Sequence, residues 1–173
     1  MTEKLEIDVR VAKAQDARAI LGLCEQVGSE TPYLTFGEEG LNLTVQEEVD
    51  IINKYNKAQN SILLVSEVDD QIIGMSNITQ FNAAKQRHIA EIGICLVEEY
   101  WGYGIASMMM EMMIEFAENT DLKVITLEVV QRNEAAIKLY EKFGFEIVGN
   151  LRKRLKVDGC YFEIGRASCR ERV

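Results

Sequence analysis

The sequence predicts a mixed α/β fold in which about six to seven strands form one central sheet, mostly antiparallel, flanked by four helices. Short apolar strands joined by tight turns fill much of the first half, a pattern typical of antiparallel pairing. Strands alternate with amphipathic helices in the second half, which is typical of parallel crossovers. The 173 residues fit a single domain, and no repeat or linker divides them.

The first half is expected to supply four strands and two helices. In chain order these are a strand over 5–11, helices over 16–27 and 44–59, and strands over 62–65, 71–76 and 89–97. The first strand alternates apolar and polar residues, as a half-buried strand does. Asp16 is an N-cap candidate for the first helix, and Gly28 suits its C-terminal end. Thr44 and Glu47 form a capping box for the second helix.

The second half is expected to supply two helices and three strands. In chain order these are a helix over 104–119, a strand over 124–129, a helix over 133–143, a strand over 145–155 and a last strand from 161. Apolar residues on the helix over 104–119 recur at helical spacing, which predicts a buried face. That face would hold Ile105, Met108, Met109, Met112, Met113 and Phe116. Asp158-Gly159 predicts a hairpin turn before the last strand.

The last eleven residues, 163–173, are expected not to be native. They resemble the translation of a sequencing-library adapter, and strand-like alternation stops at Ile164. We therefore expect one native domain over residues 1–162 that ends in a truncated strand. Without residues 163–173, which hold three arginines and two glutamates, the formal charge of −9 would become −10.

The net charge and composition exclude several classes of function. A charge of −9 argues against a phosphate-backbone partner, so no nucleic acid is expected. The acidity serves solubility or suits a cationic substrate such as a polyamine. No apolar run approaches the ~20 residues of a membrane span and no signal region precedes the first strand, which predicts a cytoplasmic protein without a membrane partner. One histidine and four cysteines without CxxC spacing predict no metal.

A glycine turn at residues 100–106, Tyr-Trp-Gly-Tyr-Gly-Ile-Ala, is the first candidate for chemistry. It follows an expected strand and opens an expected helix. Small residues let a ligand approach the backbone, and free N–H groups at a helix N-terminus favour a phosphate. The turn lacks the third glycine and the later acid of a dinucleotide-binding fold. An ordinary structural turn remains the alternative.

The second candidate is the helix over 133–143. Asn133 and Tyr140 are seven residues apart, which is about two helical turns, so they share one face. The alternative is that Asn133 only caps the helix and Tyr140 only packs in the core.

Glu91 is the third candidate, because an acid in an apolar strand is costly unless it is paired or faces a cleft. Partial burial would raise the pKa of Glu91 toward the range of a general base; the alternative is a solvent-facing acid.

The order of strand, glycine turn, helix and strand, followed by N-x-x-A-x-x-L-Y-x-x-x-G-F over 133–145, resembles the GNAT-superfamily N-acetyltransferases. The resemblance runs in order of elements from about Leu5 to Phe162. It implies acetyl-CoA as co-substrate and an amine acceptor, either a small molecule or a peptide N-terminus. A homodimer is compatible with it.

The resemblance also implies a role for individual residues. The main chain at Ile94, Cys95 and Leu96 would pair with the pantetheine arm. Main-chain amides of the turn would hold the pyrophosphate: Trp101, Gly102, Tyr103, Gly104, Ile105 and Ala106. Asn133 would contact the pantetheine arm, Tyr140 would protonate the departing thiolate, and Glu91 would deprotonate the amine.

Two further features of the resemblance concern the turn and the acceptor. Trp101 stands where the family often has Arg or Gln, so altered phosphate recognition is expected, with binding through backbone amides. The loop between the first two helices lines the acceptor pocket in relatives, which makes Tyr33 and Phe36 candidate substrate residues; ordinary packing is the alternative. The functions that compete with an acetyltransferase are a non-catalytic acyl-CoA-binding or regulatory module and a nucleotide-binding α/β protein.

Overall fold

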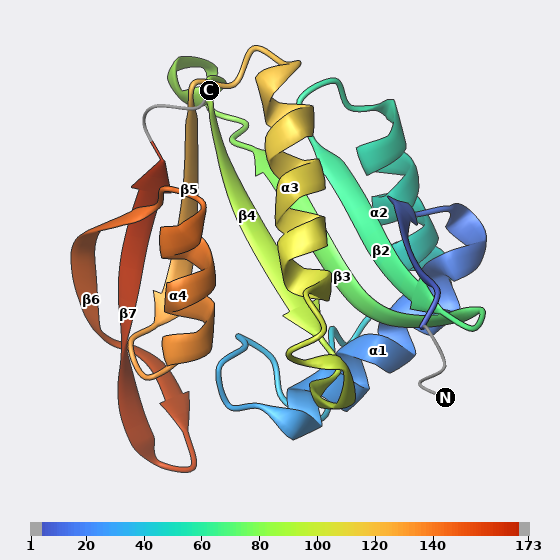
Figure 1. Cartoon of the computed structure of the whole chain (residues 1–173), viewed down its shortest axis with the longest axis horizontal. Coiled ribbons are helices and arrows are strands. Elements are labelled where there is room, and N and C mark those ends of the chain that lie inside the picture. Colours follow the sequence, from blue (N-terminus) through green and yellow to red (C-terminus); the bar gives the residue numbers. More distant parts are fainter. Residues whose placement is uncertain (1–4, 170–173) are drawn as a thin grey trace.

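The protein, described over residues 5–169 by a computed structural model, contains one seven-stranded sheet in the order β1-β2-β3-β4-β5-β7-β6 (Figure 1). Neighbouring strands are antiparallel except for β4 and β5, which are parallel. In chain order the strands are β1 (Ile7–Val11), β2 (Ile62–Val68), β3 (Gln71–Gln80), β4 (Ile89–Leu96), β5 (Val124–Val130), β6 (Glu146–Val157) and β7 (Cys160–Cys169). The predicted mixed, mostly antiparallel sheet is confirmed.

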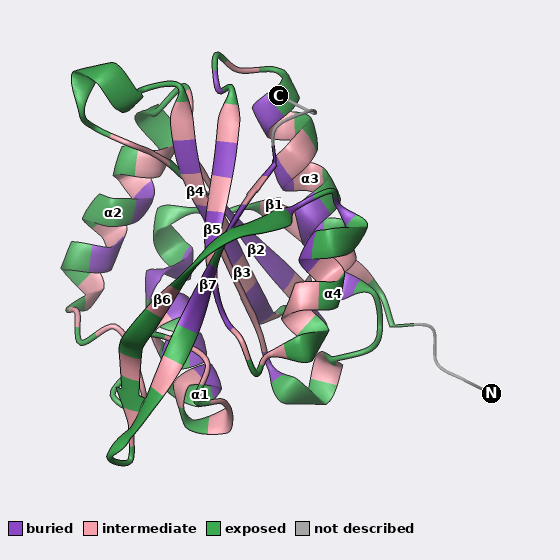
Figure 2. Ribbon diagram, turned by 90° about the vertical axis from the view of Figure 1, so that its left-hand side faces the viewer, coloured by how far each residue is buried: buried purple, intermediate pink, exposed green. Residues whose placement is uncertain are grey.

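Two pairs of helices cover the two faces of this sheet. α1 (Ala17–Glu30) and α2 (Val45–Lys57) lie on one face, and α3 (Ile105–Glu118) and α4 (Glu134–Lys142) lie on the other (Figures 1 and 2). Each pair has its own part of the core: Met113 and Leu127 belong to the cluster under α3 and α4, and Ile20 and Val65 to the cluster under α1 and α2. None of the helices described between residues 5 and 169 is long and apolar enough to cross a bilayer.

The methionine-rich helix α3 buries a face slightly rotated from the predicted one. Ile105, Met109 and Met113 are buried as predicted, but Met108 is 37% exposed and Met110 takes a place in the core. Five methionines between 108 and 113 leave several helical faces equally apolar. The position of the sheet beneath the helix decides which of them is buried.

The ends of α1 also differ from the prediction. Asp16 occupies the N-cap position, but its side chain does not cap the helix. Its carboxylate instead accepts bonds from both terminal nitrogens of Arg10, at 2.8 and 3.0 Å, and from the Lys13 N–H at 2.7 Å. The charge-assisted pair with Arg10 lowers the pKa of Asp16. Gly28 does not end the helix, which continues to Glu30.

The last strand continues beyond Phe162 in this structure, while the truncation of the native strand stays a prediction. β7 runs to Cys169 and pairs with β5 from Ile125↔Cys169 to Val130↔Ile164, as well as with β6. Residues 170–173 of the expected non-native segment lie outside the described residues. That residues 163–173 are non-native stays a prediction, which a contiguous genomic sequence encoding them would refute.

Glu48 on α2 carries a prediction about stability. It is 2% exposed, its Oε2 atom has no hydrogen-bond partner within residues 5–169, and burial raises its pKa. A raised pKa in the folded state means that unfolding releases a proton, so stability falls as pH rises above the ordinary glutamate value of about 4.3. Glu48→Gln should therefore raise the free energy of unfolding at pH 7 by about 1–3 kcal/mol, because a neutral amide costs less to bury without a partner than an ionised carboxylate does.

Urea denaturation between pH 4 and pH 8 measures this effect. The gain of Glu48→Gln over the wild type should shrink toward pH 4, where the Glu48 carboxyl is mostly protonated in both the folded and the unfolded protein. Glu111→Gln on the exposed side of α3 is the control and should change stability little at any pH. A Glu48→Gln protein that is no more stable than the wild type at pH 7 would contradict the prediction.

Candidate active site

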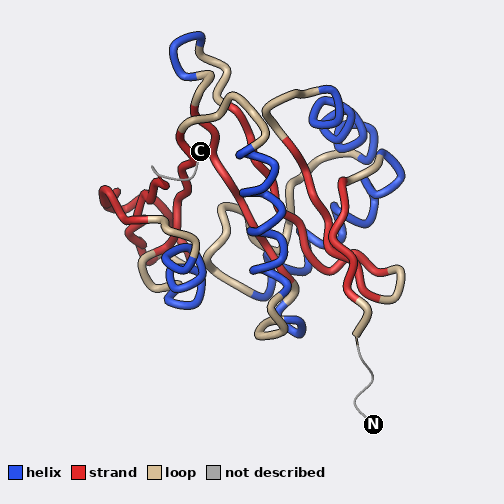
Figure 3. The backbone as a smooth tube through the Cα atoms, turned by 45° about the horizontal axis from the view of Figure 1, so that its top comes forward, coloured by secondary structure: helices blue, strands red, loops and turns tan. Residues whose placement is uncertain are grey.

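β4 and β5 pair over only three residues and then part. Their parallel register runs from Ile89↔Val124 to Glu91↔Thr126, whereas β4 stays paired with β3 as far as Leu96. Figures 1 and 3 show the two strands diverging toward the end where α3 begins. The rest of β4, from residue 92 to residue 96, therefore presents one edge that no other described strand covers.

The main-chain groups along this edge point into the opening. The Val97 N–H donates to the Ile73 carbonyl oxygen at 2.9 Å, on the β3 side. Because neighbouring residues of a strand direct their main-chain groups to opposite edges, Leu96, Ile94 and Ile92 face the side from which β5 has parted. By the same alternation the main chain of Cys95 faces β3. A ligand with amide groups could pair with the free edge as an added strand does.

The Trp101 side chain already forms a hydrogen bond with one main-chain group of that edge. Its indole Nε1 donates to the Leu96 carbonyl oxygen at 2.8 Å. The Leu96 carbonyl is thereby satisfied, while the N–H of Leu96 still faces the opening. Because of this bond the indole N–H is unavailable to a phosphate. The Trp101 side chain therefore stabilises the end of β4 and does not offer a donor to a ligand, as an Arg or Gln at this position could.

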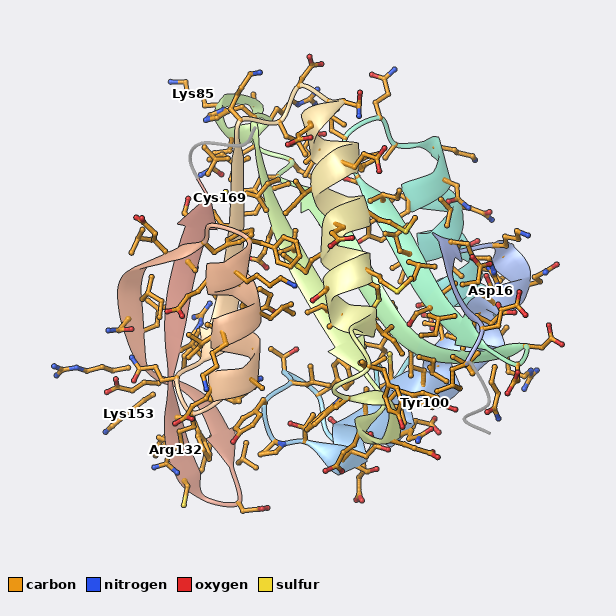
Figure 4. All side chains as sticks on the ribbon, in the orientation of Figure 1. Asp16, Lys85, Tyr100, Arg132, Lys153 and Cys169 are labelled. Atoms are coloured by element: carbon orange, nitrogen blue, oxygen red, sulfur yellow. The ribbon has the colours of Figure 1, made fainter. Side chains whose placement is uncertain are left out.

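The glycine turn continues from this point into α3. Gly102 and Gly104 have φ values of +84° and +80°, which favour glycine, and Gly104 is the N-cap of α3 with no side-chain cap. The first N–H groups of the helix are therefore open toward the turn, as an anion site requires. Tyr100 marks this end of the molecule in Figure 4.

One cleft of about 610 Å³ brings together nearly all of the predicted residues. Those that line it are Tyr33, Phe36, Glu91, Ile94, Cys95, Leu96, Trp101, Gly102, Gly104, Ile105, Ala106, Asn133 and Tyr140. Tyr103 is the exception: it is 58% exposed and does not line the cleft. No group of three or more His, Cys, Asp or Glu within residues 5–169 is placed to hold a metal ion.

Tyr140 reaches the cleft from α4. It is 8% exposed, and its ring packs edge-on against Phe145 with 6.1 Å between the ring centroids. Burial raises the pKa of Tyr140, and the nearby Cys95 thiol raises it further. The hydroxyl is therefore a firmly protonated group in an apolar setting, and at neutral pH it has a proton to donate.

Asn133 both caps α4 and faces the cleft, so its structural and its proposed functional role are compatible. Its side-chain Oδ1 accepts from the Ala136 N–H at 3.2 Å and so caps α4. The residue also lines the cleft. Because the cap uses only the oxygen, the amide nitrogen keeps its two donors for a ligand.

Glu91 lies on β4 beside a second carboxylate that the sequence did not single out. Glu128 on β5 also lines the cleft, and its negative charge adds to burial in raising the pKa of Glu91. Arg166 and Arg154 lower that pKa, but their effects are smaller. Glu128 could have been found from the alternation of β5, since an acid stands there in an apolar strand as Glu91 does in β4.

The loop from Thr31 to Gly37 forms the wall of the cleft next to α1. It folds back so closely on the helix that a Cβ atom at Gly28 would lie 1.9 Å from the Gly37 carbonyl oxygen. Only a glycine permits this approach. Gly28, predicted as a helix end, therefore positions the loop that holds Tyr33 and Phe36.

Comparison with known proteins agrees with this geometry. Residues 31–145 match the model of the acetyltransferase (GNAT) family. An L-amino acid N-acetyltransferase of Escherichia coli, AaaT, is 36% identical over 102 residues, which are 58% of this chain and 62% of the relative. A spermidine N(1)-acetyltransferase of the same organism is 28% identical over 76% of this chain and 66% of the relative. The chain thus spans just under two thirds of each relative's length.

Among solved structures, an acetyltransferase of the GNAT family from Streptococcus pneumoniae superimposes with a TM-score of 0.90. It is 29% identical in sequence, and the match covers 94% of this chain and 98% of that one. The family model covers more than half of the residues, and the mixed, mostly antiparallel sheet with its four helices agrees with the resemblance in the sequence. The chain belongs to the GNAT acetyltransferase family.

Proposed function

We propose that this protein transfers the acetyl group of acetyl-CoA to a primary amine, with both substrates held in the cleft at once. The observation that carries this proposal is the convergence of four features on one cleft. They are the free edge of β4, the glycine turn at the start of α3, the buried Tyr140 and the half-buried Glu91.

Acetyl-CoA would bind along β4. The main chain of Ile94 would pair with the amides of the pantetheine arm, the Asn133 amide would add a donor, and the Leu96 N–H would face the acetyl carbonyl oxygen. The Trp101 N–H already donates to the Glu98 carbonyl oxygen at 3.0 Å, so the pyrophosphate would take the N–H groups of the turn from Gly102 to Ala106, where the helix dipole favours negative charge. Because these contacts are made by backbone groups, Trp101 does not prevent them.

The transfer would proceed by direct attack. The amine nitrogen attacks the thioester carbonyl carbon, and Glu91 takes a proton from the amine, directly or through water. The Leu96 N–H would stabilise the oxyanion. The C–S bond then breaks, and Tyr140 gives its proton to the departing sulfur. The products are the N-acetylated amine and free CoA, and Tyr140 and Glu91 regain their resting protonation from water.

Cys95 indicates how the cleft would affect the departing sulfur. It lines the same cleft, and burial raises the pKa of its thiol to about 12. A thiolate of CoA in such surroundings would be similarly basic, because desolvation disfavours the charged form. Burial raises the pKa of Tyr140 as well, so the sulfur and the tyrosine would become more basic together.

Release of free thiol from acetyl-CoA across a panel of amines tests the proposal. The panel would hold L-amino acids, diamines, simple alkylamines and peptides with free N-termini. Amine-dependent thiol release supports an acetyltransferase. Acetyl-CoA binding in calorimetry without thiol release from any amine would favour a non-catalytic acyl-CoA-binding module, and binding of ATP or NAD in its place would favour a nucleotide-binding protein. Either result would refute the proposal.

The loop next to α1 yields a prediction about the acceptor. Gly28→Ala places a methyl group where the Gly37 carbonyl now lies, so the loop with Tyr33 and Phe36 must move. We expect the KM of the amine to rise about tenfold, a displacement worth about 1.4 kcal/mol, while the KM of acetyl-CoA changes little. Overpacking should also lower the stability by about 1–3 kcal/mol.

Gly22→Ala is the matched control for this substitution. Gly22 lies in the same helix, and no described atom outside the neighbouring residues and backbone of that helix lies within 4 Å of the position of its Cβ. Alanine should stabilise the helix there by about 1 kcal/mol without affecting the amine. Steady-state kinetics with both substrates and thermal denaturation make the comparison. Equal amine KM values in the two variants would show that the loop does not contact the acceptor.

A further inference from the structure

The charged residues that line the cleft all have the same sign. Glu91 and Glu128 are the two acidic residues among the lining residues, and the described lining contains no Lys, Arg or His. The remaining polar groups are hydroxyls and amides, such as those of Thr35 and Asn77. A carboxylate on the acceptor would find no cationic side chain here, whereas an ammonium would find two carboxylates.

The two glutamates lie on adjacent strands and point to the same side of the sheet. Glu91 is in register with Thr126, and Glu128 follows Thr126 by two residues. Because side chains alternate along a strand, Glu91, Thr126 and Glu128 share one face. They stand where β4 and β5 begin to part, so the space between the two carboxylates opens into the cleft.

The neighbouring cations leave Glu128 partly available. Arg166 donates from Nη2 to Oε1 of Glu128 at 2.6 Å, and that arginine is 48% exposed at its side chain. Oε2 of Glu128 has no part in this contact. Arg154, the other base whose charge reaches Glu91, lies on the exposed strand β6 outside the lining. Figure 4 shows two further basic residues, Lys153 and Arg132, near the β6–β7 hairpin.

We propose that the acceptor carries a second positive charge, as a diamine or polyamine does, and that Glu128 is the residue that selects for it. This inference rests on the proposed function. The reacting amine would meet Glu91, and the non-reacting ammonium would bind the free oxygen of Glu128. Tyr33 and Phe36, which line the same cleft, can cover the alkyl chain or the face of an ammonium.

A matched pair of acceptors tests the selection. 1,4-Diaminobutane and butylamine share their reacting amine and alkyl chain, and differ in the second ammonium. The kcat/KM of the diamine should exceed that of butylamine by tenfold or more, and the excess should shrink as salt screens the charges. L-Alanine and L-glutamine serve as carboxylate-bearing acceptors and should react no better than butylamine.

Glu128→Gln connects the preference to the residue. The variant keeps the size of the side chain and can still accept a hydrogen bond from Arg166. The ratio of kcat/KM for diamine over butylamine should fall toward one, mainly through a higher KM for the diamine. Glu146→Gln, at an exposed position at the start of β6, should leave the ratio unchanged. Because the readout is a ratio measured on one preparation, partial loss of folded protein does not affect it.

Three results would overturn the inference. They are equal use of butylamine and the diamine, preference for an amino acid, and a ratio that Glu128→Gln does not change. Each of these can occur while thiol release from acetyl-CoA remains amine-dependent, so the proposed transferase would stand. Absence of thiol release with every amine would refute the transferase, and the inference with it.

Discussion

Replacing Tyr140 by phenylalanine should lower kcat by about 10²–10⁴-fold, the usual contribution of a positioned proton donor. The ring, its burial and its edge-on contact with Phe145 would remain, so only the hydroxyl is lost. The KM of acetyl-CoA should change little, because the proposed contacts of the cofactor lie on β4 and the turn. Thiol release under saturating substrates gives kcat, and calorimetry gives the affinity for acetyl-CoA.

The pH profile adds a second criterion for Tyr140. A general acid must be protonated, and activity falls as pH rises through its pKa. Because burial raises the pKa of Tyr140 above its ordinary value of about 10, no loss of activity due to this group should occur below pH 10. Tyr161→Phe, at an exposed tyrosine of β7, is the matched control and should behave as the wild type. Equal turnover of Tyr140→Phe and the control would remove Tyr140 from the mechanism.

Replacing Glu91 by glutamine should lower kcat/KM for the amine by about 10²-fold or more, because the amide cannot take a proton. A general base must be ionised, so activity falls as pH falls through its pKa. Burial and the charge of Glu128 raise the pKa of Glu91, which places this acid limb above the ordinary glutamate value of about 4.3. The limb should be absent in Glu91→Gln.

The neighbouring carboxylate provides an internal check on this assignment. Glu128→Gln removes a negative charge that raises the pKa of Glu91, so the acid limb of the wild-type profile should move to lower pH in that variant. Glu146→Gln should leave the limb in place. A profile of kcat/KM that is the same in wild type and Glu91→Gln would show that another group, or water, accepts the proton.

Much of the fold could be predicted from local patterns. The strand β1, the capping box of Thr44 and Glu47, and the hairpin turn at Asp158-Gly159 each depend on residues close together in the chain, and the structure contains all three, although Val11 at the end of β1 is exposed. The two motifs at 100–106 and 133–145 could be recognised for the same reason. Their spacing along a turn and a helix determines which of their residues share a side.

The remaining features depend on contacts between distant segments. Periodicity could not show which methionines of α3 face the sheet, nor that the Asp16 carboxylate binds Arg10 instead of capping α1. The structure also extends β7 to Cys169, beyond the point where apolar alternation stops in the sequence, because β5 and β6 supply partners on both of its edges. Pairing partners and packing surfaces are decided by the assembled sheet.

The sequence by itself determined the order and type of the elements, the glycine turn and the helix that carries Asn133 and Tyr140. Only the tertiary structure decided that β4 and β5 part after Glu91, that the Trp101 indole donates a hydrogen bond to the Leu96 carbonyl, and that Glu128 lies beside Glu91 in the cleft. The physical reason is the range of the interactions. Backbone propensity and amphipathic spacing act over a few residues, whereas the shape and charge of a cleft arise where strands far apart in the chain come together.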